Sequence, residues 1–258
     1  MEKKKNQKLI IANWKMYPAT LKEAKKTFND FKKQKTINKN VTTVICPPFQ
    51  YINELKKSYR GTKIFFGAQD VFYEKEGAFT GEISNEMIKD MGARFVIIGH
   101  SERRILGETN KEISKKVLQS LKFGFHVILC VGEKERDFEG MYLKELNMQI
   151  RESLENVPAN LLSKLVIAYE PIWAIGEGKK AMDSKEMHFI SLFIRKQLIK
   201  MFNKKVSALV AVLYGGSVKS DNAVDFVKED EVDGLLVGRA SQDPFEFSKI
   251  ITNVSSSI

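Results

Sequence analysis

The feature that most constrains the fold is a regular alternation of short apolar runs with amphipathic segments. There are eight runs: LIIA from Leu9, TTVIC from Thr42, KIFFGA from Lys63, FVIIG from Phe95, HVILCVG from His126, LVIAY from Leu165, ALVAVLYGG from Ala208 and GLLVGRA from Gly234. Short apolar runs bounded by polar residues are typical of parallel strands that are buried on both faces. We therefore predict a strand at each run.

The segments between these runs carry apolar residues at i, i+3 and i+4, which indicates amphipathic helices. The clearest are residues 21–33 (LKEAKKTFNDFKK), 110–123 (NKEISKKVLQSLKF), 185–202 (KEMHFISLFIRKQLIKMF) and 244–253 (PFEFSKIITN). A strict strand and helix alternation requires parallel strands with right-handed crossovers, and eight units in 258 residues match the usual size of a closed barrel. The sequence thus predicts an α/β fold, a single (β/α)8 barrel of eight parallel strands ringed by helices, as one domain over residues 1–258.

A doubly wound open sheet is the alternative architecture for such an alternation. Its dinucleotide-binding form requires a GxGxxG fingerprint directly after an early strand. The first apolar run of this chain continues instead into NWKMYP, which puts a lysine where that fold needs glycines. The closed barrel is therefore favoured.

The chain has a formal charge of +10. Such a charge can indicate nucleic-acid or membrane-surface binding. The lysines are spread along helical faces, however, and no basic motif studded with aromatic residues occurs. We predict an ordinary lysine-rich surface that attracts a small anionic substrate, with no nucleic-acid partner and no membrane partner.

The lengths of the apolar runs and the positions of the cysteines predict the cellular compartment of the protein. Every apolar run is far below the roughly 20 residues of a membrane helix, and LII after MEKKKNQK is shorter than the core of a signal peptide. The two cysteines, Cys46 and Cys130, end strand-like runs, which suits reduced buried thiols better than a disulfide. A cytoplasmic protein is expected.

In a barrel of this kind the active site gathers at the carboxyl ends of the strands. The polar and glycine residues that follow the predicted strands are Asn13 and Lys15 after the first, His100 and Ser101 after the fourth, Glu170 after the sixth, Gly215, Gly216 and Ser217 after the seventh, and Gly238 and Arg239 after the eighth. Acid–base groups and anion-binding backbone are therefore expected on one rim.

Glu170 lies between the apolar run LVIAY and PIWAIGEGK. Pro171 favours an extended conformation for its predecessor, and Gly176 and Gly178 supply permissive backbone, as in a hinged lid. A helix cap or a surface ion pair is the ordinary role of a glutamate, but this position favours a base that works under a lid that excludes water.

His100 directly follows a strand and stands beside Ser101, a good helix cap. A helix amino terminus disfavours imidazolium, so we predict a neutral imidazole that polarises a carbonyl. His126 and His188 are interpreted as structural. Lys15 is either a surface lysine or, beside Asn13, a fixed ammonium that stabilises an oxyanion or a phosphate.

LYGGSV (residues 213–218) offers consecutive backbone N–H groups on a glycine turn, which can bind an anion. With VGRAS after the eighth strand, it matches the loops where barrels often hold phosphate, although GGS alone is usually just a turn. Neither HExxH, nor a CxxC pair, nor a nucleophile elbow occurs, so no metal and no cofactor are predicted. A carboxylate base, a neutral imidazole, an ammonium and anion-binding turns together suit proton transfer beside a carbonyl in a small phosphorylated substrate.

The segments ANWKM, GAQD, GAFTGEIS, IIGHSERR, CVGE, AYEPIWAIG, YGGSV and DGLLVG occur in the order and near the spacing of one known family. Over essentially its whole length the chain resembles the triosephosphate isomerases, whose (β/α)8 fold is the TIM barrel. The resemblance implies interconversion of dihydroxyacetone phosphate and D-glyceraldehyde 3-phosphate in glycolysis and gluconeogenesis, without metal or cofactor.

The resemblance also implies residue roles. Glu170 is expected to move a proton between neighbouring carbons through an enediolate. Neutral His100 is expected to shuttle or donate protons to the two oxygens, and Lys15 and Asn13 are expected to hold the negative charge. Phosphate is expected on backbone N–H groups, those of Gly176, Ser217, Gly238 and Arg239. Cys130, Glu102 and Glu108 match supporting positions. The loop from Gly77 to Ser84 resembles the one that enters a neighbouring subunit near Asn13 and Lys15, which implies a homodimer.

Two residues depart from the family pattern. Glu177 stands in the lid where the family usually has threonine, and we expect it to face solvent. Arg239 stands where the family usually has a second glycine, which would cost about 1 kcal/mol or more if the position needs a positive φ. Another (β/α)8 isomerase or lyase acting on a different sugar phosphate is the nearest enzyme alternative. A basic binding protein with an inert barrel is the non-enzyme alternative.

Overall fold

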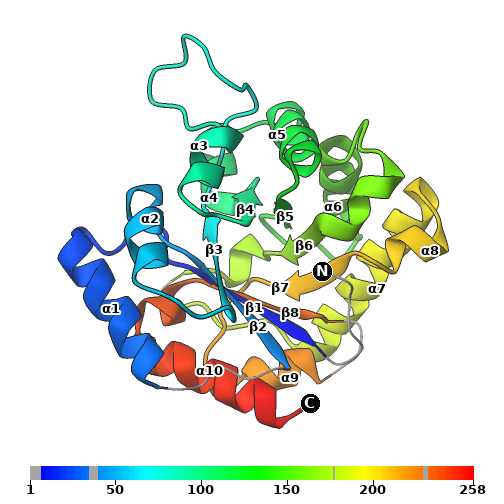
Figure 1. The fold of residues 1–258 in the computed structure, drawn as a ribbon. Coiled ribbons are helices and arrows are strands. Elements are labelled where there is room, and N and C mark those ends of the chain that lie inside the picture. Colours follow the sequence, from blue (N-terminus) through cyan, green and yellow to red (C-terminus); the bar gives the residue numbers. More distant parts are fainter. Residues whose placement is uncertain (1–6, 35–39, 177, 229–231) are drawn as a thin grey trace.

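A computed structural model describes residues 7–34, 40–176, 178–228 and 232–258 of the chain. Parallel strands pair in sequence order and close into a barrel in which β8 returns to β1 (Figure 1). The strands are β1 (Lys8–Asn13), β2 (Val41–Cys46), β3 (Ile64–Ala68), β4 (Phe95–Ile98), β5 (His126–Val131), β6 (Leu165–Tyr169), β7 (Ala211–Tyr214) and β8 (Gly234–Val237). The predicted (β/α)8 barrel is confirmed.

Helices surround the strands on the outside of the barrel (Figure 1). They are α1 (Leu21–Lys33), α2 (Phe49–Lys57), α3 (Asn85–Asp90), α4 (Ser101–Ile105), α5 (Asn110–Phe123), α6 (Met141–Ser153), α7 (Ser184–Met201), α8 (Lys204–Ser207), α9 (Ala223–Val227) and α10 (Pro244–Ser256), with short 3-10 turns η1 (Ala159–Lys164), η2 (Ile172–Ala174) and η3 (Arg239–Gln242).

The four predicted helices coincide with α1, α5, α7 and α10, with small shifts at the ends of the last two. Thr20 and Thr109 begin α1 and α5 with reciprocal capping boxes to Glu23 and Glu112, which satisfy the first backbone N–H groups. The predicted seventh strand began too early, because Ala208 is the carboxyl cap of the short helix α8.

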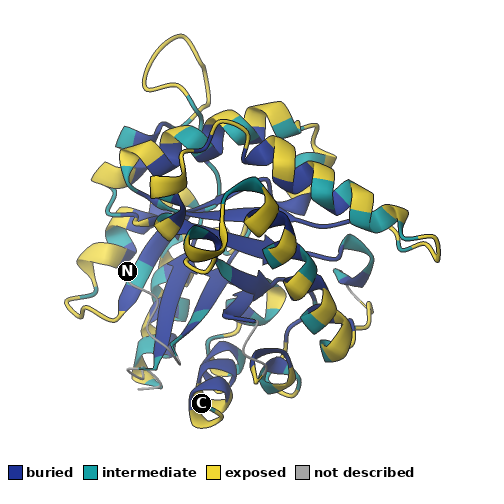
Figure 2. Ribbon diagram, turned by 90° about the vertical axis from the view of Figure 1, so that its right-hand side faces the viewer, coloured by how far each residue is buried: buried dark blue, intermediate teal, exposed yellow. Residues whose placement is uncertain are grey.

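Side chains of each strand alternate between the barrel interior and the layer under the helices. In β6, Val166 and Ala168 belong to the interior cluster, whereas Leu165, Ile167 and Tyr169 pack toward the helices. The strands are buried throughout most of their length while the helices expose their outer faces (Figure 2). The position after β6 therefore points inward again.

The barrel closes where β8 meets β1, in the register Leu9 to Gly234. A Cβ atom at Gly234 would lie 1.9 Å from the carbonyl oxygen of Leu9, so only glycine allows the two backbones to approach this closely. Interior packing includes Cys46 and Cys130, which are both free and buried, as the sequence predicted. Burial raises the pKa of both thiols.

The loop that contains Gly77 to Ser84 stands clear of the barrel between β3 and α3 (Figures 1 and 2). Phe79, within this loop, exposes 43% of its surface. In the described part of the chain, no helix combines the length and apolar character needed to cross a membrane.

Candidate active site

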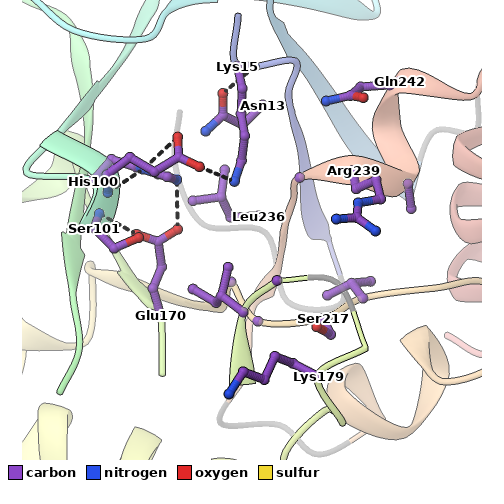
Figure 3. Close-up of a pocket in the computed structure, with 18 of the residues that line it drawn as sticks. Asn13, Lys15, His100, Ser101, Glu170, Lys179, Ser217, Leu236, Arg239 and Gln242 are labelled. Carbon is purple, nitrogen blue, oxygen red and sulfur yellow. Dashed lines mark hydrogen bonds and ion pairs between the residues drawn. The ribbon is translucent and has the colours of Figure 1, made fainter. Parts of the chain in front are cut away.

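A cavity of roughly 1260 Å³ opens at the carboxyl ends of the strands. All the predicted site residues line it, from Asn13 and Lys15 through His100 and Glu170 to Gly176, Ser217, Gly238 and Arg239 (Figure 3). Alternation along the strands explains the convergence, because Ile11, Ala168, Leu213 and Leu236 point into the barrel and the residues two positions later do the same.

Glu170 is 3% exposed and is the most enclosed carboxylate of this cavity. Its backbone N–H donates to Val131, which extends the β5–β6 ladder by one residue. One carboxylate oxygen lies 3.1 Å from Nε2 of His100, and the other accepts the backbone N–H of Ser101 at 3.3 Å. The carboxylate thus rests against the β4 loop, on the far side of the cavity from Ser217 (Figure 3).

Gly215 makes room for this carboxylate. A Cβ atom there would lie 2.8 Å from Cγ of Glu170, well inside normal contact distance. The glycine that sequence analysis assigned to an anion-binding turn therefore has a second task, because it leaves the volume in which the Glu170 side chain lies.

His100 is 5% exposed and is itself the N-cap of α4. Its Nδ1 accepts the backbone N–H of Glu102 at 3.2 Å. The expectation that Ser101 supplies the cap is therefore wrong, since the imidazole takes that role and Ser101 is the first helical residue. A nitrogen that accepts a hydrogen bond carries no proton, so this arrangement fits a neutral ring protonated at Nε2.

The protonation of the Glu170–His100 pair follows from opposed influences. Burial raises the pKa of Glu170, but the contact with His100 and the Ser101 N–H lower it to a net value below the ordinary one. Burial lowers the pKa of His100, while the carboxylates of Glu170 and Glu102 raise it to a net value above the ordinary one. Glu170 is therefore ionised, and the neutral imidazole stays a prediction that the Nδ1 hydrogen bond supports.

Lys15 has a left-handed backbone with a φ of 56°, which is rare for a residue other than glycine. Such a conformation costs about 1–3 kcal/mol and needs surrounding contacts to hold it. The Lys15 N–H donates to Oδ1 of Asn13 at 3.0 Å, and Nε2 of Gln69 donates to the Lys15 carbonyl at 2.8 Å and to that of Cys46 at 2.9 Å. The ammonium lies 2.6 Å from Glu102.

Gln69 is a functional candidate that sequence analysis did not single out. It follows β3 directly, in the GAQD segment, so its place at the carboxyl end of a strand is the signal that could have found it. Because its amide joins the carbonyls of Lys15 and Cys46, it fixes the backbone that aims the ammonium.

The start of the predicted lid is anchored to Glu133, a buried residue that follows β5. Oε1 of Glu133 accepts hydrogen bonds from the Tyr169 hydroxyl and from Nε1 of Trp173, both at 2.8 Å. Gly176 and Gly178 have φ values of 124° and 72°, conformations that glycine adopts readily. A fixed indole therefore precedes a permissive backbone, as the lid prediction requires.

Arg136 adds to this anchor from the β5–α6 loop. Its guanidinium nitrogens lie 3.2 Å from a carboxylate oxygen of Glu133 and 3.1 Å from one of Glu186. The guanidinium carbon lies 5.2 Å from the centre of the Trp173 ring. Neither Glu133 nor Arg136 was given a role from the sequence, because their partners are distant along the chain.

The side of the cavity opposite Glu170 and His100 is lined by the predicted lid and by the loops that follow β7 and β8. The hydroxyl of Ser217 donates to the Ala174 carbonyl at 2.7 Å, which ties the β7 loop to the lid base. Among the described residues the positive-φ residues other than glycine are Lys15 and Asn156, so the conditional strain at Arg239 does not arise. Glu177 lies outside the described residues.

His126 and His188 do not line the cavity. His126 begins β5 and stacks on Phe95, and His188 lies within α7, as the structural interpretation expects. In the described ranges, no group of three or more His, Cys, Asp and Glu side chains is placed to hold a metal ion.

Glu170 and His100 form a pair of acid–base groups that can exchange protons with a ligand, and glycine-rich turns line the cavity opposite them. These properties place the chain among the (β/α)8-barrel enzymes that perform acid–base chemistry on small anionic substrates.

Comparison with known proteins is consistent with this class. The family profile described as Triosephosphate isomerase matches residues 8–254. A triosephosphate isomerase of Aquifex aeolicus is 45% identical over 249 residues, which cover 95% of this chain and 98% of the relative. Relatives of the same name from Dictyoglomus thermophilum and Finegoldia magna are 42% and 44% identical, over 95% and 94% of this chain and 98% and 97% of their own. The chain belongs to the triosephosphate isomerase family.

Proposed function

We propose that the chain interconverts dihydroxyacetone phosphate and D-glyceraldehyde 3-phosphate as an aldose–ketose isomerase. The observation that carries this proposal is the placement of the Glu170 carboxylate, the His100 imidazole and the Lys15 ammonium in one cavity beside glycine-rich loops. Membership of the triosephosphate isomerase family supports the choice of a three-carbon substrate over another sugar phosphate. We also infer that the enzyme works in the cytoplasm, in glycolysis and gluconeogenesis, and needs no cofactor.

Glu170 is the proposed base. Its buried carboxylate is held ionised, because His100 and the Ser101 N–H lower its pKa against the effect of burial. To reach a substrate carbon it must first leave Nε2 of His100, which lies 3.1 Å away. It then removes a proton from one carbon and returns it to the neighbouring carbon, through an enediolate.

The oxygens of the enediolate need hydrogen-bond donors because negative charge develops on them. Nε2 of His100 faces the same space as the Glu170 carboxylate, so a neutral imidazole would donate there once Glu170 has moved away. Lys15 is the proposed positive charge and Asn13 its partner, since the Asn13 side chain accepts the Lys15 N–H and fixes the direction of that backbone.

The phosphate group of the substrate is proposed to bind on the side of the cavity opposite Glu170 and His100. The backbone N–H groups of Gly176, Ser217, Gly238 and Arg239 are the proposed donors, because consecutive N–H groups in glycine-rich turns bind anions. With phosphate held there, the reacting carbons would lie beside His100, within reach of Glu170 once its carboxylate has left Nε2 of His100. Closure of the lid over the bound substrate would exclude water and suppress loss of phosphate from the enediolate.

A coupled assay with D-glyceraldehyde 3-phosphate tests the proposal on the wild type and on Glu170→Gln. The amide keeps the size of the side chain but cannot take a proton, so kcat should fall by about three orders of magnitude or more. Activity that survived this substitution would remove Glu170 as the base. A wild type that processed a different sugar phosphate and not this one would favour another reaction on the same barrel.

We further propose that two copies assemble through the loop from Gly77 to Ser84. A second cavity, of roughly 630 Å³, lies beside Lys15, Gln69 and Glu102, and the protruding loop carries the exposed Phe79. A copy of this loop from a partner would fill such a cavity and cover Lys15 from the side. Analytical ultracentrifugation of the wild type and of Phe79→Asp tests this: a dimer that the substitution dissociates is expected, and a wild-type monomer would contradict it.

A further inference from the structure

Arg239 occupies a position in the cavity that its backbone role does not explain. It follows Gly238 at the carboxyl end of β8 and begins η3, and its side chain is exposed. The guanidinium points into the cavity from the β8 side and lies across from Ser217 (Figure 3). The side chain therefore approaches the same space as the loops proposed to hold phosphate.

The backbone that carries this side chain is firmly fixed. Ser241 donates to the Gly238 carbonyl through its N–H at 2.9 Å and through its hydroxyl at 2.7 Å. The side-chain amide of Gln242 donates to the Trp14 carbonyl at 3.3 Å. The Arg239 backbone is thus held by contacts within η3 and to the residue that follows β1, which reduces the backbone entropy that a ligand contact would cost.

The other cations of the cavity differ from Arg239 in kind. Lys15 forms an ion pair with Glu102 at 2.6 Å, and Lys179, Lys180 and Lys219 are exposed lysines, which act on an anion as single point charges. Arg239 is the one arginine among the described residues that line the cavity. A planar guanidinium can donate two parallel hydrogen bonds to one phosphate and keeps its charge across the whole working pH range.

Two carboxylates, those of Asp243 and Glu246, also line the cavity at the start of α10, Asp243 as the N-cap and Glu246 in the first turn. Asp243 accepts the backbone N–H groups of Phe245 and Glu246, and Glu246 accepts the N–H and hydroxyl of Ser220. Both acids therefore have structural partners at the ends of neighbouring elements. A dianionic phosphate attracts a guanidinium more strongly than a singly charged carboxylate at the same distance does.

We propose that the Arg239 side chain binds the phosphate group of the substrate directly, in addition to the backbone donor at the same residue. This inference rests on the proposed isomerase function and names a specificity residue for it. The phosphate is unchanged between substrate, enediolate and product, so the contact stabilises all three nearly equally. Its loss should then raise KM more than it lowers kcat.

The experiment compares wild type, Arg239→Gln, Arg239→Lys and Lys249→Gln. Lys249 lies exposed on α10 outside the cavity lining, so Lys249→Gln removes the same unit of charge without touching the site. KM and kcat are measured with D-glyceraldehyde 3-phosphate, and binding of inorganic phosphate is measured by calorimetry. Arg239→Gln should raise KM and weaken phosphate binding by about tenfold, with kcat reduced less than KM is raised. Arg239→Lys should recover part of the loss, and Lys249→Gln should match the wild type.

Unchanged KM and unchanged phosphate binding in Arg239→Gln would overturn the inference. Equal losses in Arg239→Gln and Lys249→Gln would also overturn it, because the effect would then come from total charge. A fall in thermal stability with phosphate affinity retained would assign Arg239 a structural role instead. A wild type that lacks isomerase activity contradicts the proposed function, and in that case the calorimetric comparison with inorganic phosphate still decides whether Arg239 binds the anion.

Discussion

The two sides of the active-site cavity are built in different ways. On the acid–base side, Glu170 and His100 are almost fully buried, and each ring or carboxylate atom that could react already contacts a neighbour. On the side proposed to hold phosphate, Lys179 and Arg239 are exposed, and the cavity is lined by glycine-rich turns. Positioning therefore depends on side-chain packing on one side and on loop conformation on the other.

This difference predicts where substitutions act. Changes on the acid–base side should lower kcat steeply, because geometry there is fixed by a few contacts and small displacements are costly. Changes on the phosphate side should have smaller effects that appear mainly in KM, because several donors share one anion.

The largest effect is expected for His100→Asn. The asparagine oxygen can still accept the Glu102 N–H and cap α4, but the donor at Nε2 is lost, so kcat should fall by about 10²- to 10⁴-fold. Because His100 lowers the pKa of Glu170, that pKa should rise in the variant. The acid limb of the pH profile of kcat/KM should then move to higher pH, and an unmoved limb would mean that His100 does not set the ionisation of Glu170.

The same pair makes a prediction for stability. A depressed pKa of Glu170 stabilises the fold above the ordinary carboxyl pKa, and this contribution is lost as the pH falls through the lowered value. Urea unfolding of the wild type and of Glu170→Gln, compared across the acid range, measures the difference. The stability advantage of the wild type should shrink on acidification.

A smaller effect is expected for Gly215→Ala. The added methyl would lie 2.8 Å from Cγ of Glu170 and must displace that side chain, so kcat should fall by about 10²-fold with KM less affected. Steady-state kinetics measures this, and a thermal melt checks that the barrel remains folded. Wild-type kcat in a folded variant would show that the carboxylate tolerates displacement.

Gln69→Ala should cost about tenfold in kcat/KM. It leaves the carbonyls of Lys15 and Cys46 without their side-chain donor and releases the left-handed backbone at Lys15. Gln69→Glu is the matched variant, because it keeps the length of the side chain but replaces the amide donor with an acceptor. Both variants should be impaired; normal activity in Gln69→Glu would exclude the proposed positioning role.

The smallest effect is expected on the phosphate side, for Ser217→Ala. It removes the hydroxyl that ties the β7 loop to the Ala174 carbonyl and keeps the Ser217 backbone N–H. KM should rise only a few-fold, with kcat nearly unchanged, because one neutral hydrogen bond contributes about 1 kcal/mol. A loss as large as that of Gly215→Ala would remove the contrast between the two sides.

Sequence periodicity was sufficient for the barrel, because each strand is a continuous apolar run and each rim residue follows such a run. It also placed Glu170, His100 and Lys15 at one cavity. Contacts between residues far apart in the chain were not predictable in this way. The Gln69 amide donates to the Lys15 carbonyl, and Glu133 accepts hydrogen bonds from the Tyr169 hydroxyl at the end of β6 and from the Trp173 indole in η2.

Two local features also escaped the sequence. The left-handed backbone at Lys15 has no signal in residue type, since lysine has no preference for it. The choice of His100 over Ser101 as the cap of α4 depends on where β4 ends, and serine is the better cap by propensity. Both depend on tertiary contacts that fix the backbone first.

The two buried thiols inside the barrel can report how often the barrel opens. Neither Cys46 nor Cys130 presents surface to a reagent in the closed barrel, and burial keeps both in the unreactive protonated form. A thiol-specific dye can therefore modify them only when strands separate. The rate of labelling measures how often the barrel opens, without denaturant and without any need for catalysis.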